Sequence, residues 1–114
     1  MTMANFPTVV GDFTQGGKFI LAVVRNQSGK EKSIIRAVQG FTLPHIEMFR
    51  DLEAQTARHK LSVESRGGGC HFCSKADKTI ELGDTSSTLG RADNKKVAEM
   101  IRLLYPEYTV RVNG

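Results

Sequence analysis

An almost unbroken apolar run, KFILAVVR at residues 18–25, limits the fold more tightly than any other part of this sequence. β-Branched residues are frequent in the run, two glycines precede it, and the turn-forming stretch Asn26–Gly29 follows it. A bounded apolar run of this kind predicts a strand that is buried on both faces. A second strand is expected at residues 32–38. The short connection between the two predicts an antiparallel hairpin.

The rest of the chain predicts two helices and three more strands. Thr42 can cap a first helix that continues to about Ala57, and Asp93 or Asn94 can cap a second one that ends before Pro106. Alternation of apolar and polar residues predicts strands at residues 61–65, 78–82 and 108–112. The three glycines at 67–69 are expected to break the first of these, and a loop is expected to follow them.

These segments give the order ββαββαβ. The predicted fold class is α/β of the α+β type: a single mixed β-sheet of about five to six strands, with two α-helices covering one face. A length of 114 residues fits one domain, 1–114, in which residues 1–15 form a loose arm with a short extended piece at Thr8–Val10.

Composition excludes several classes of protein. Sixteen lysines and arginines against twelve acidic residues give a net charge of +4, but the charge is dispersed, so no nucleic-acid partner is expected. No apolar stretch reaches the ~18–20 residues of a membrane span, so no membrane partner is expected either. Two cysteines and an N-terminus without signal-peptide features indicate a cytoplasmic protein, and nothing in the pattern demands more than a monomer.

His45 is the first candidate for chemistry, because it opens the predicted first helix. Free N–H groups and the helix dipole favour anions at that end, and they favour the neutral, basic form of an imidazole. A neutral histidine beside an anion site is suited to deprotonating a water molecule that attacks phosphorus. The alternative is a surface histidine near a helix cap.

The loop Gly83–Gly90 is the second candidate. Thr85, Ser86, Ser87 and Thr88 place four hydroxyl groups in succession between glycines, just before the second helix. Such a loop can turn several N–H groups inward as an anion-binding nest. It is not a P-loop, because the G-x-x-x-x-G-K-[ST] pattern is absent. The alternative is an ordinary solvated turn.

Two further features are more ambiguous. Lys18 opens the apolar strand, where it is either a phosphate ligand or an edge lysine whose stem covers apolar surface. Cys70-His-Phe-Cys73 has the C-x-x-C spacing of redox and zinc sites, but no second cysteine pair accompanies it. Incidental loop cysteines, a redox pair and a metal site remain open for it.

Taken together, these pieces resemble the Janus/Ocnus family of small protein phosphohistidine phosphatases. The resemblance runs from about residue 18 to residue 112. It is carried by the order and spacing of GKFILAVVR (17–25), KSIIR (32–36), GFTLPHIEMFRDL (40–52), the glycine triplet, LGDTSSTLG (82–90) and LLYPEYTVRV (103–112). It implies hydrolysis of the P–N bond of phosphohistidine in substrate proteins, with no metal and no cofactor.

The resemblance also implies roles for individual residues. His45 is the general base, the N–H of Ile46 helps to hold the phosphate, and Lys18 is the lysine of the first strand. The family's serine falls on Thr85 or Ser86, and its backbone donor falls on Ser87 or Thr88, because this loop is one residue longer than the family pattern. Family members often have arginine where this chain has Cys70, and Arg66 is an alternative source of that charge.

Two alternatives follow from the same residues. His45 can attack phosphorus itself and form a phosphoenzyme. A non-catalytic module of the same fold can use the pocket to bind phosphorylated or otherwise anionic partners.

Overall fold

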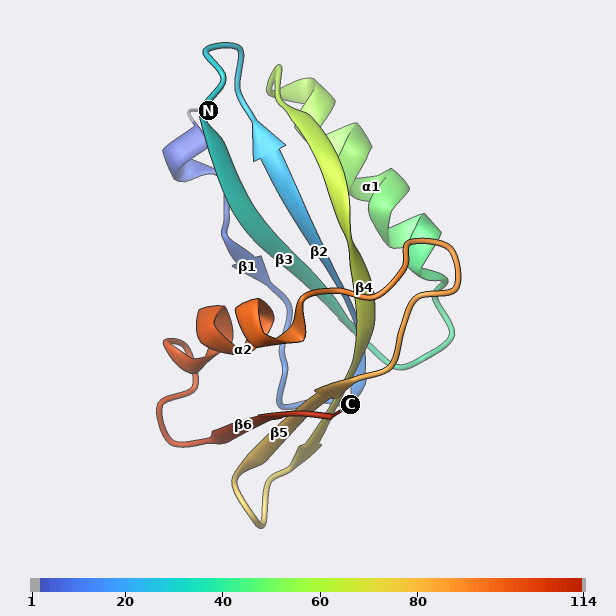
Figure 1. Cartoon of the computed structure of the whole chain (residues 1–114), viewed down its shortest axis with the longest axis vertical. Helices are drawn as coiled ribbons and strands as arrows, with labels where there is room; N and C mark the ends of the chain where they lie inside the picture. The colour runs from blue at the N-terminus through green and yellow to red at the C-terminus, as the bar shows by residue number, and fades with distance from the viewer. Residues whose placement is uncertain (1–2, 114) are drawn as a thin grey trace.

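The computed structural model describes residues 3–113, which form one sheet with helices against it (Figure 1). In chain order the elements are the 3-10 helix η1 (Met3–Asn5), β1 (Val9–Val10), β2 (Gly17–Arg25), β3 (Glu31–Gln39), α1 (His45–Arg58), β4 (Ser62–Ser74), β5 (Thr79–Gly83), α2 (Asn94–Arg102) and β6 (Thr109–Val112). None of the helices within this range is long and apolar enough to cross a membrane.

The sheet is mixed and has six strands in the order β1-β3-β2-β4-β5-β6. β2 pairs antiparallel with both β3 and β4, which makes the apolar run an interior strand. The two short outer strands are parallel to their neighbours, β1 to β3 and β6 to β5. The predicted fold class, the element order and the hairpin of β2 and β3 are therefore confirmed.

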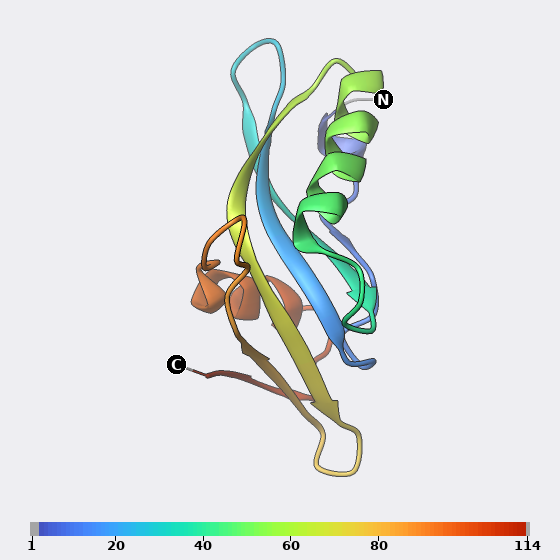
Figure 2. The ribbon, with the colours of Figure 1, turned by 90° about the vertical axis from the view of Figure 1, so that its right-hand side faces the viewer.

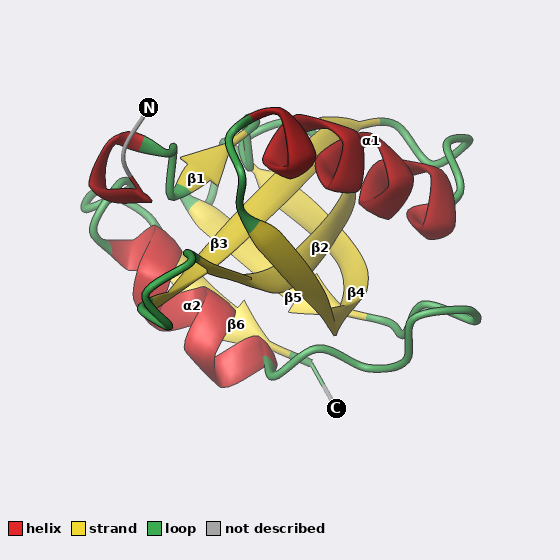
Figure 3. Ribbon diagram, turned by 90° about the horizontal axis from the view of Figure 1, so that it is seen from above, coloured by secondary structure: helices red, strands yellow, loops and turns green. Residues whose placement is uncertain are grey.

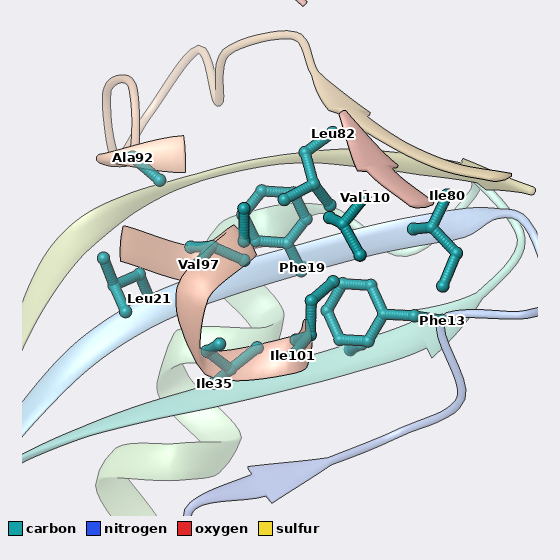
Figure 4. Packing of buried hydrophobic residues seen from close by; sticks show 12 residues of the cluster. Phe13, Phe19, Leu21, Ile35, Ile80, Leu82, Ala92, Val97, Ile101 and Val110 are labelled. Atoms are coloured by element: carbon teal, nitrogen blue, oxygen red, sulfur yellow. The ribbon is translucent and has the colours of Figure 1, made fainter. Parts of the chain in front are cut away.

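The two helices lie on opposite faces of the sheet, so the expectation that both cover one face is wrong (Figure 2). Successive side chains of a strand point to opposite faces. Phe19 and Leu21 of β2 pack with α2, in the cluster that Figure 4 shows. Ile20 and Ala22 pack on the other face, against α1. An apolar strand with both faces buried requires a cover on each side, and Figure 3 shows the sheet between the two helices.

β4 is the main departure from the predicted elements. The strand runs unbroken through the three glycines and through Cys70–Cys73, which were expected to form a break and a loop. Glycine is needed there because neighbouring backbone comes close: a Cβ on Gly69 would lie 2.4 Å from the carbonyl oxygen of Gly83. Glycine inside a strand often marks a place where another backbone approaches closely.

The start of α1 and the N-terminal arm also differ from expectation. Pro44, not Thr42, is the N-cap of α1, and no side chain caps this helix. Residues 3–15, expected to be a loose arm, are anchored: Phe6 and Phe13 are buried, and β1 pairs with β3. The guanidinium of Arg36 holds the arm through the carbonyl oxygens of Pro7 and Thr8, so its role is structural. Residues 1 and 2 lie outside the described range.

Candidate functional site

His45 is the first residue of α1, and its side chain is turned inward onto the glycine triplet of β4. Its Nε2 atom lies 2.8 Å from the carbonyl oxygen of Gly69, and the residue is only 9% exposed. A carbonyl oxygen can only accept a hydrogen bond, so Nε2 must carry the proton. In the neutral ring the lone pair that can take a proton is then on Nδ1.

Nδ1 of His45 is also accessible. It makes no hydrogen bond within residues 3–113, yet it is not among the polar side-chain atoms that are fully enclosed without a partner there. Both ring nitrogens of His71, by contrast, are enclosed in this way. His45 therefore has one nitrogen that fixes the ring and a second one that is neither hydrogen-bonded nor fully enclosed, which is the arrangement that a general base needs.

Gly68 provides the space that the imidazole occupies. A Cβ at this position would lie 2.7 Å from Cδ2 of His45 and 2.9 Å from the carbonyl oxygen of Phe19. Any larger residue would push the ring out of place. The sequence alone predicted only a break at these glycines, and this role was missed. The three consecutive glycines were themselves the available signal, because such a run often marks the close approach of another group.

The loop between β5 and α2 is tied to the same triplet (Figure 1). The N–H of Ser86 donates to the carbonyl oxygen of Gly68. The N–H of Gly68 in turn donates to the carbonyl oxygen of Gly90. The loop is closed by a hydrogen bond from the N–H of Gly90 to the carbonyl oxygen of Ser86. Because His45 and this loop both contact the triplet, the structure brings the first and second candidates together.

Ser86 and its neighbours differ in what they can offer a ligand. Ser86 is buried; its hydroxyl accepts from the N–H of Leu89 and lies 3.4 Å from the hydroxyl oxygen of Thr88. Thr85, Ser87 and Thr88 are exposed. Among the described residues, the N–H groups of Ser87 and Thr88 have no acceptor. The loop thus holds its shape through Ser86 and leaves the N–H groups of Ser87 and Thr88 unused.

Ile46 supplies a further donor. The N–H groups of Glu47 and Met48 both reach the carbonyl oxygen of Pro44. The N–H of Ile46 precedes them, where a helix provides no carbonyl partner. This donor lies next to His45 at the positive end of the α1 dipole, so it is suited to an anion.

Lys18 lies on the same face of the sheet as His45. It has the parity of Ile20, which packs with α1, and it is paired with Cys70 of β4. Burial raises the pKa of the Cys70 thiol; the nearby Asp84 carboxylate raises it further, and the Lys18 ammonium opposes the rise. The Lys18 charge is therefore one strand position beyond the glycines that seat His45.

The two cysteines do not form a common site. They are three positions apart on one strand, so their side chains point to opposite faces. Cys73 packs against the cluster beneath α2, whereas Cys70 faces the side of Lys18. Both are free thiols. No three His, Cys, Asp or Glu side chains within residues 3–113 converge to hold a metal ion. Arg66, the alternative source of positive charge beside the triplet, is exposed and paired with Glu64.

Comparison with family models places the chain. The model of the Janus/Ocnus family (Ocnus) matches residues 3–109, which is nearly the whole chain. A search of curated proteins finds no match. The family match covers His45, the glycine triplet and the loop after β5, the segments that the geometry brings together.

Proposed function

The chain belongs to the Janus/Ocnus family, and we propose that it is a protein phosphohistidine phosphatase, a hydrolase that cleaves the P–N bond of phosphohistidine with His45 as general base. The observation that carries the proposal is the hydrogen bond from Nε2 of His45 to the carbonyl oxygen of Gly69. It holds the ring and leaves Nδ1 as the basic nitrogen, not fully enclosed and next to the free N–H of Ile46 at the helix start.

The phosphoryl group is placed between the start of α1 and the loop after β5. The N–H groups of Ile46, Ser87 and Thr88 are the free backbone donors on its two sides. The Lys18 ammonium balances its negative charge from β2. Fixed N–H donors of this kind stabilise the charge of a phosphoryl group without having to reorganise during the reaction.

In the proposed step a water molecule attacks phosphorus as Nδ1 of His45 takes its proton. The substrate imidazole carries a proton from solvent on its other nitrogen, so when the P–N bond breaks it takes the electron pair of that bond and leaves as a neutral ring. His45 then releases its proton to solvent. The products are histidine and inorganic phosphate. Proton transfer to a positioned base contributes typically ~10²–10⁴-fold. No metal takes part in this scheme, because backbone donors and Lys18 carry the electrostatic work.

The geometry of the loop favours one of the two alignments of its serine. Ser86 is buried with its hydroxyl directed toward Thr88 and Leu89, whereas Thr85 is exposed. An inward hydroxyl that already orders the loop is better placed to donate to a bound phosphate than one in solvent. We therefore assign the serine role to Ser86 and the backbone donor two residues later to Thr88.

The test is release of phosphate from a histidine-phosphorylated protein in the presence of EDTA, beside the same measurement on phosphoserine and phosphotyrosine peptides. The proposal expects turnover of the first substrate only. A folded wild-type protein that binds phosphate but releases none from phosphohistidine would contradict it and would favour a non-catalytic phospholigand-binding module. Turnover that EDTA abolishes would contradict the metal-independent scheme.

The substrate class sets further expectations. We expect the partners of the protein to be phosphohistidine-containing proteins, and we expect it to act on them as a monomer in the cytoplasm. Light scattering at micromolar concentration checks the monomeric state, and imaging of the tagged protein checks the location.

A further inference from the structure

Two phenylalanines are stacked on the surface beside the candidate site. Phe41, in the segment that leads into α1, and Phe72 of β4 have ring centroids 5.6 Å apart and an interplanar angle of 22°. They are 47% and 44% exposed. The two rings form a small, ordered aromatic surface in water, and an exposed aromatic face can attract a cationic group.

The stack continues the line of the site along β4. Phe72 is two residues beyond Cys70, so it points to the same face as the Cys70 and Lys18 pair. At ~3.4 Å per residue, Phe72 is ~10 Å along the strand from Gly69, whose carbonyl holds His45. An extended peptide covers the same distance in about three residues. A phosphohistidine at His45 would thus place a neighbouring side chain of its own peptide over Phe72.

A single carboxylate lies beside Phe72. Glu81 of β5 is the direct cross-strand partner of Phe72, so the two side chains share a face. They line a hollow of about 210 Å³, together with Cys73, Ser74 and Thr79. Asn113 donates to one oxygen of the Glu81 carboxylate. Arg111 of β6 is in register with Glu81 on its other side. No cation within residues 3–113, Arg111 included, forms an ion pair with Glu81.

An aromatic face beside an unpaired carboxylate is the combination that receives a cationic side chain. A guanidinium stacks on the ring and pairs with the carboxylate at the same time. All residues that line the hollow belong to the β4–β5 hairpin. The end of this hairpin extends beyond α1 (Figure 2). An aliphatic side chain would use the rings but leave the carboxylate without a cationic partner.

We propose that the Phe72–Glu81 hollow, with Phe41 behind it, is a specificity site for an arginine or lysine within about three residues of the phosphohistidine in the substrate. This inference rests on the proposed function, because it takes His45 as the place of the phosphohistidine. The hollow would select substrates by their peptide sequence, and it is separate from the residues that bind the phosphate.

The experiment scans one arginine, leucine or glutamate through positions −4 to +4 of an alanine-rich phosphohistidine peptide. At one position we expect KM to be about tenfold lower with arginine than with glutamate, with leucine between them. Glu81→Gln and Phe72→Leu should each remove most of this preference and leave hydrolysis of free phosphohistidine unchanged. Glu99→Gln, which neutralises an exposed carboxylate on α2, is the matched control and should retain the preference.

Equal KM values at every position, a preference for leucine over arginine, or a preference that survives both variants would overturn the inference. Binding of the same peptides with a non-hydrolysable phosphonate in place of the phosphoryl group separates this outcome from failure of the proposed function. If the protein hydrolyses nothing but still binds the arginine peptide about tenfold more tightly in a Glu81-dependent way, the specificity site stands and the catalytic proposal falls. Equal binding of all three peptides overturns the specificity site.

Discussion

Nε2 of His45 is hydrogen-bonded to the carbonyl oxygen of Gly69 across 24 positions of sequence, at 2.8 Å. This one contact connects the start of α1 to the interior of β4 and sets the tautomer of the imidazole. The proposed base is therefore held in position by the backbone of the sheet and not by another side chain. The most specific predictions therefore concern the glycines beneath the ring.

Gly68→Ala should impair catalysis by displacing His45. The added Cβ would lie 2.7 Å from Cδ2 of the ring, and a misplacement of ~1 Å can cost about 100-fold in rate. We expect kcat/KM to fall by about that factor, with a loss of about 1–3 kcal/mol in unfolding free energy from overpacking. Gly16→Ala is the control, because its Cβ would meet Phe41 at an ordinary 3.5 Å. Wild-type kcat/KM in the Gly68 variant would show that the ring position is unimportant.

Lys18→Ala should weaken substrate binding more than it slows the chemical step. The ammonium lies at the edge of the site, opposite Cys70, and supplies charge but no proton transfer. We expect KM to rise by about tenfold, the order of effect of one charge-assisted contact, with a smaller change in kcat. Steady-state kinetics at two salt concentrations checks this. Unchanged KM and kcat would show that Lys18 is only a lysine at the edge of the strand and does not bind substrate.

His71 should make the fold sensitive to mild acid. Its ring lies between Phe13 and Phe19 and is fully buried. Burial lowers the pKa of this imidazole; the nearby carbonyl groups of Val38 and Lys18 offset part of the effect, although neither forms a hydrogen bond with the ring. As the pH falls, His71 therefore takes up a proton in the unfolded chain at a higher pH than in the folded protein. The stability that the neutral ring contributes is present above about pH 6.5 and is lost as the pH falls toward and through the folded pKa.

Urea unfolding at pH 7.5 and 5.5 measures this effect. The wild type should be less stable at the lower pH, and His71→Leu should show a smaller difference between the two. The pKa of the Asp12 carboxyl is lowered by its hydrogen bonds to Thr14, so its contribution is lost only below about pH 4, outside this window. An equal pH dependence in the variant would remove His71 as the cause.

The two cysteines should not form a disulfide within one chain. Three residues of strand separate their Cα atoms by ~10 Å, beyond the ~7 Å limit for a disulfide, and the side chains point to opposite faces. After treatment with oxidised glutathione, mass spectrometry should find no intramolecular crosslink. Because burial raises the pKa of Cys70, its alkylation at pH 8 should also be slow. A crosslink between the two would contradict the strand assignment of residues 70–73.

Local patterns were sufficient to predict most of the fold. The β2–β3 hairpin, both helices and the capping of α2 by Asp93 follow from periodicity and turn residues close together in sequence. The passage of β4 through three glycines does not, because it depends on a partner strand approximately 50 residues earlier. The placement of α1 and α2 on opposite faces likewise depends on long-range packing of alternate β2 residues.

The site was predictable residue by residue but not as an arrangement. The position of His45 at a helix start and the hydroxyl-rich loop were visible in the sequence. That both contact the glycine triplet, and that Lys18 faces the same side, depends on the register between β2 and β4. The stack of Phe41 on Phe72 joins residues 31 positions apart and had no local signal.

The most direct test of the central claim is the rate of phosphate release from a histidine-phosphorylated protein by wild type and His45→Ala, with circular dichroism and urea unfolding on both proteins. We predict that the variant retains its fold and that its kcat is ~10²–10⁴-fold lower, or lower still. We also predict that no phosphorylated His45 can be trapped in the wild type during turnover. Full activity in a folded His45→Ala variant would show that His45 is not the general base. A trapped phosphohistidine at position 45 would show that His45 is the nucleophile.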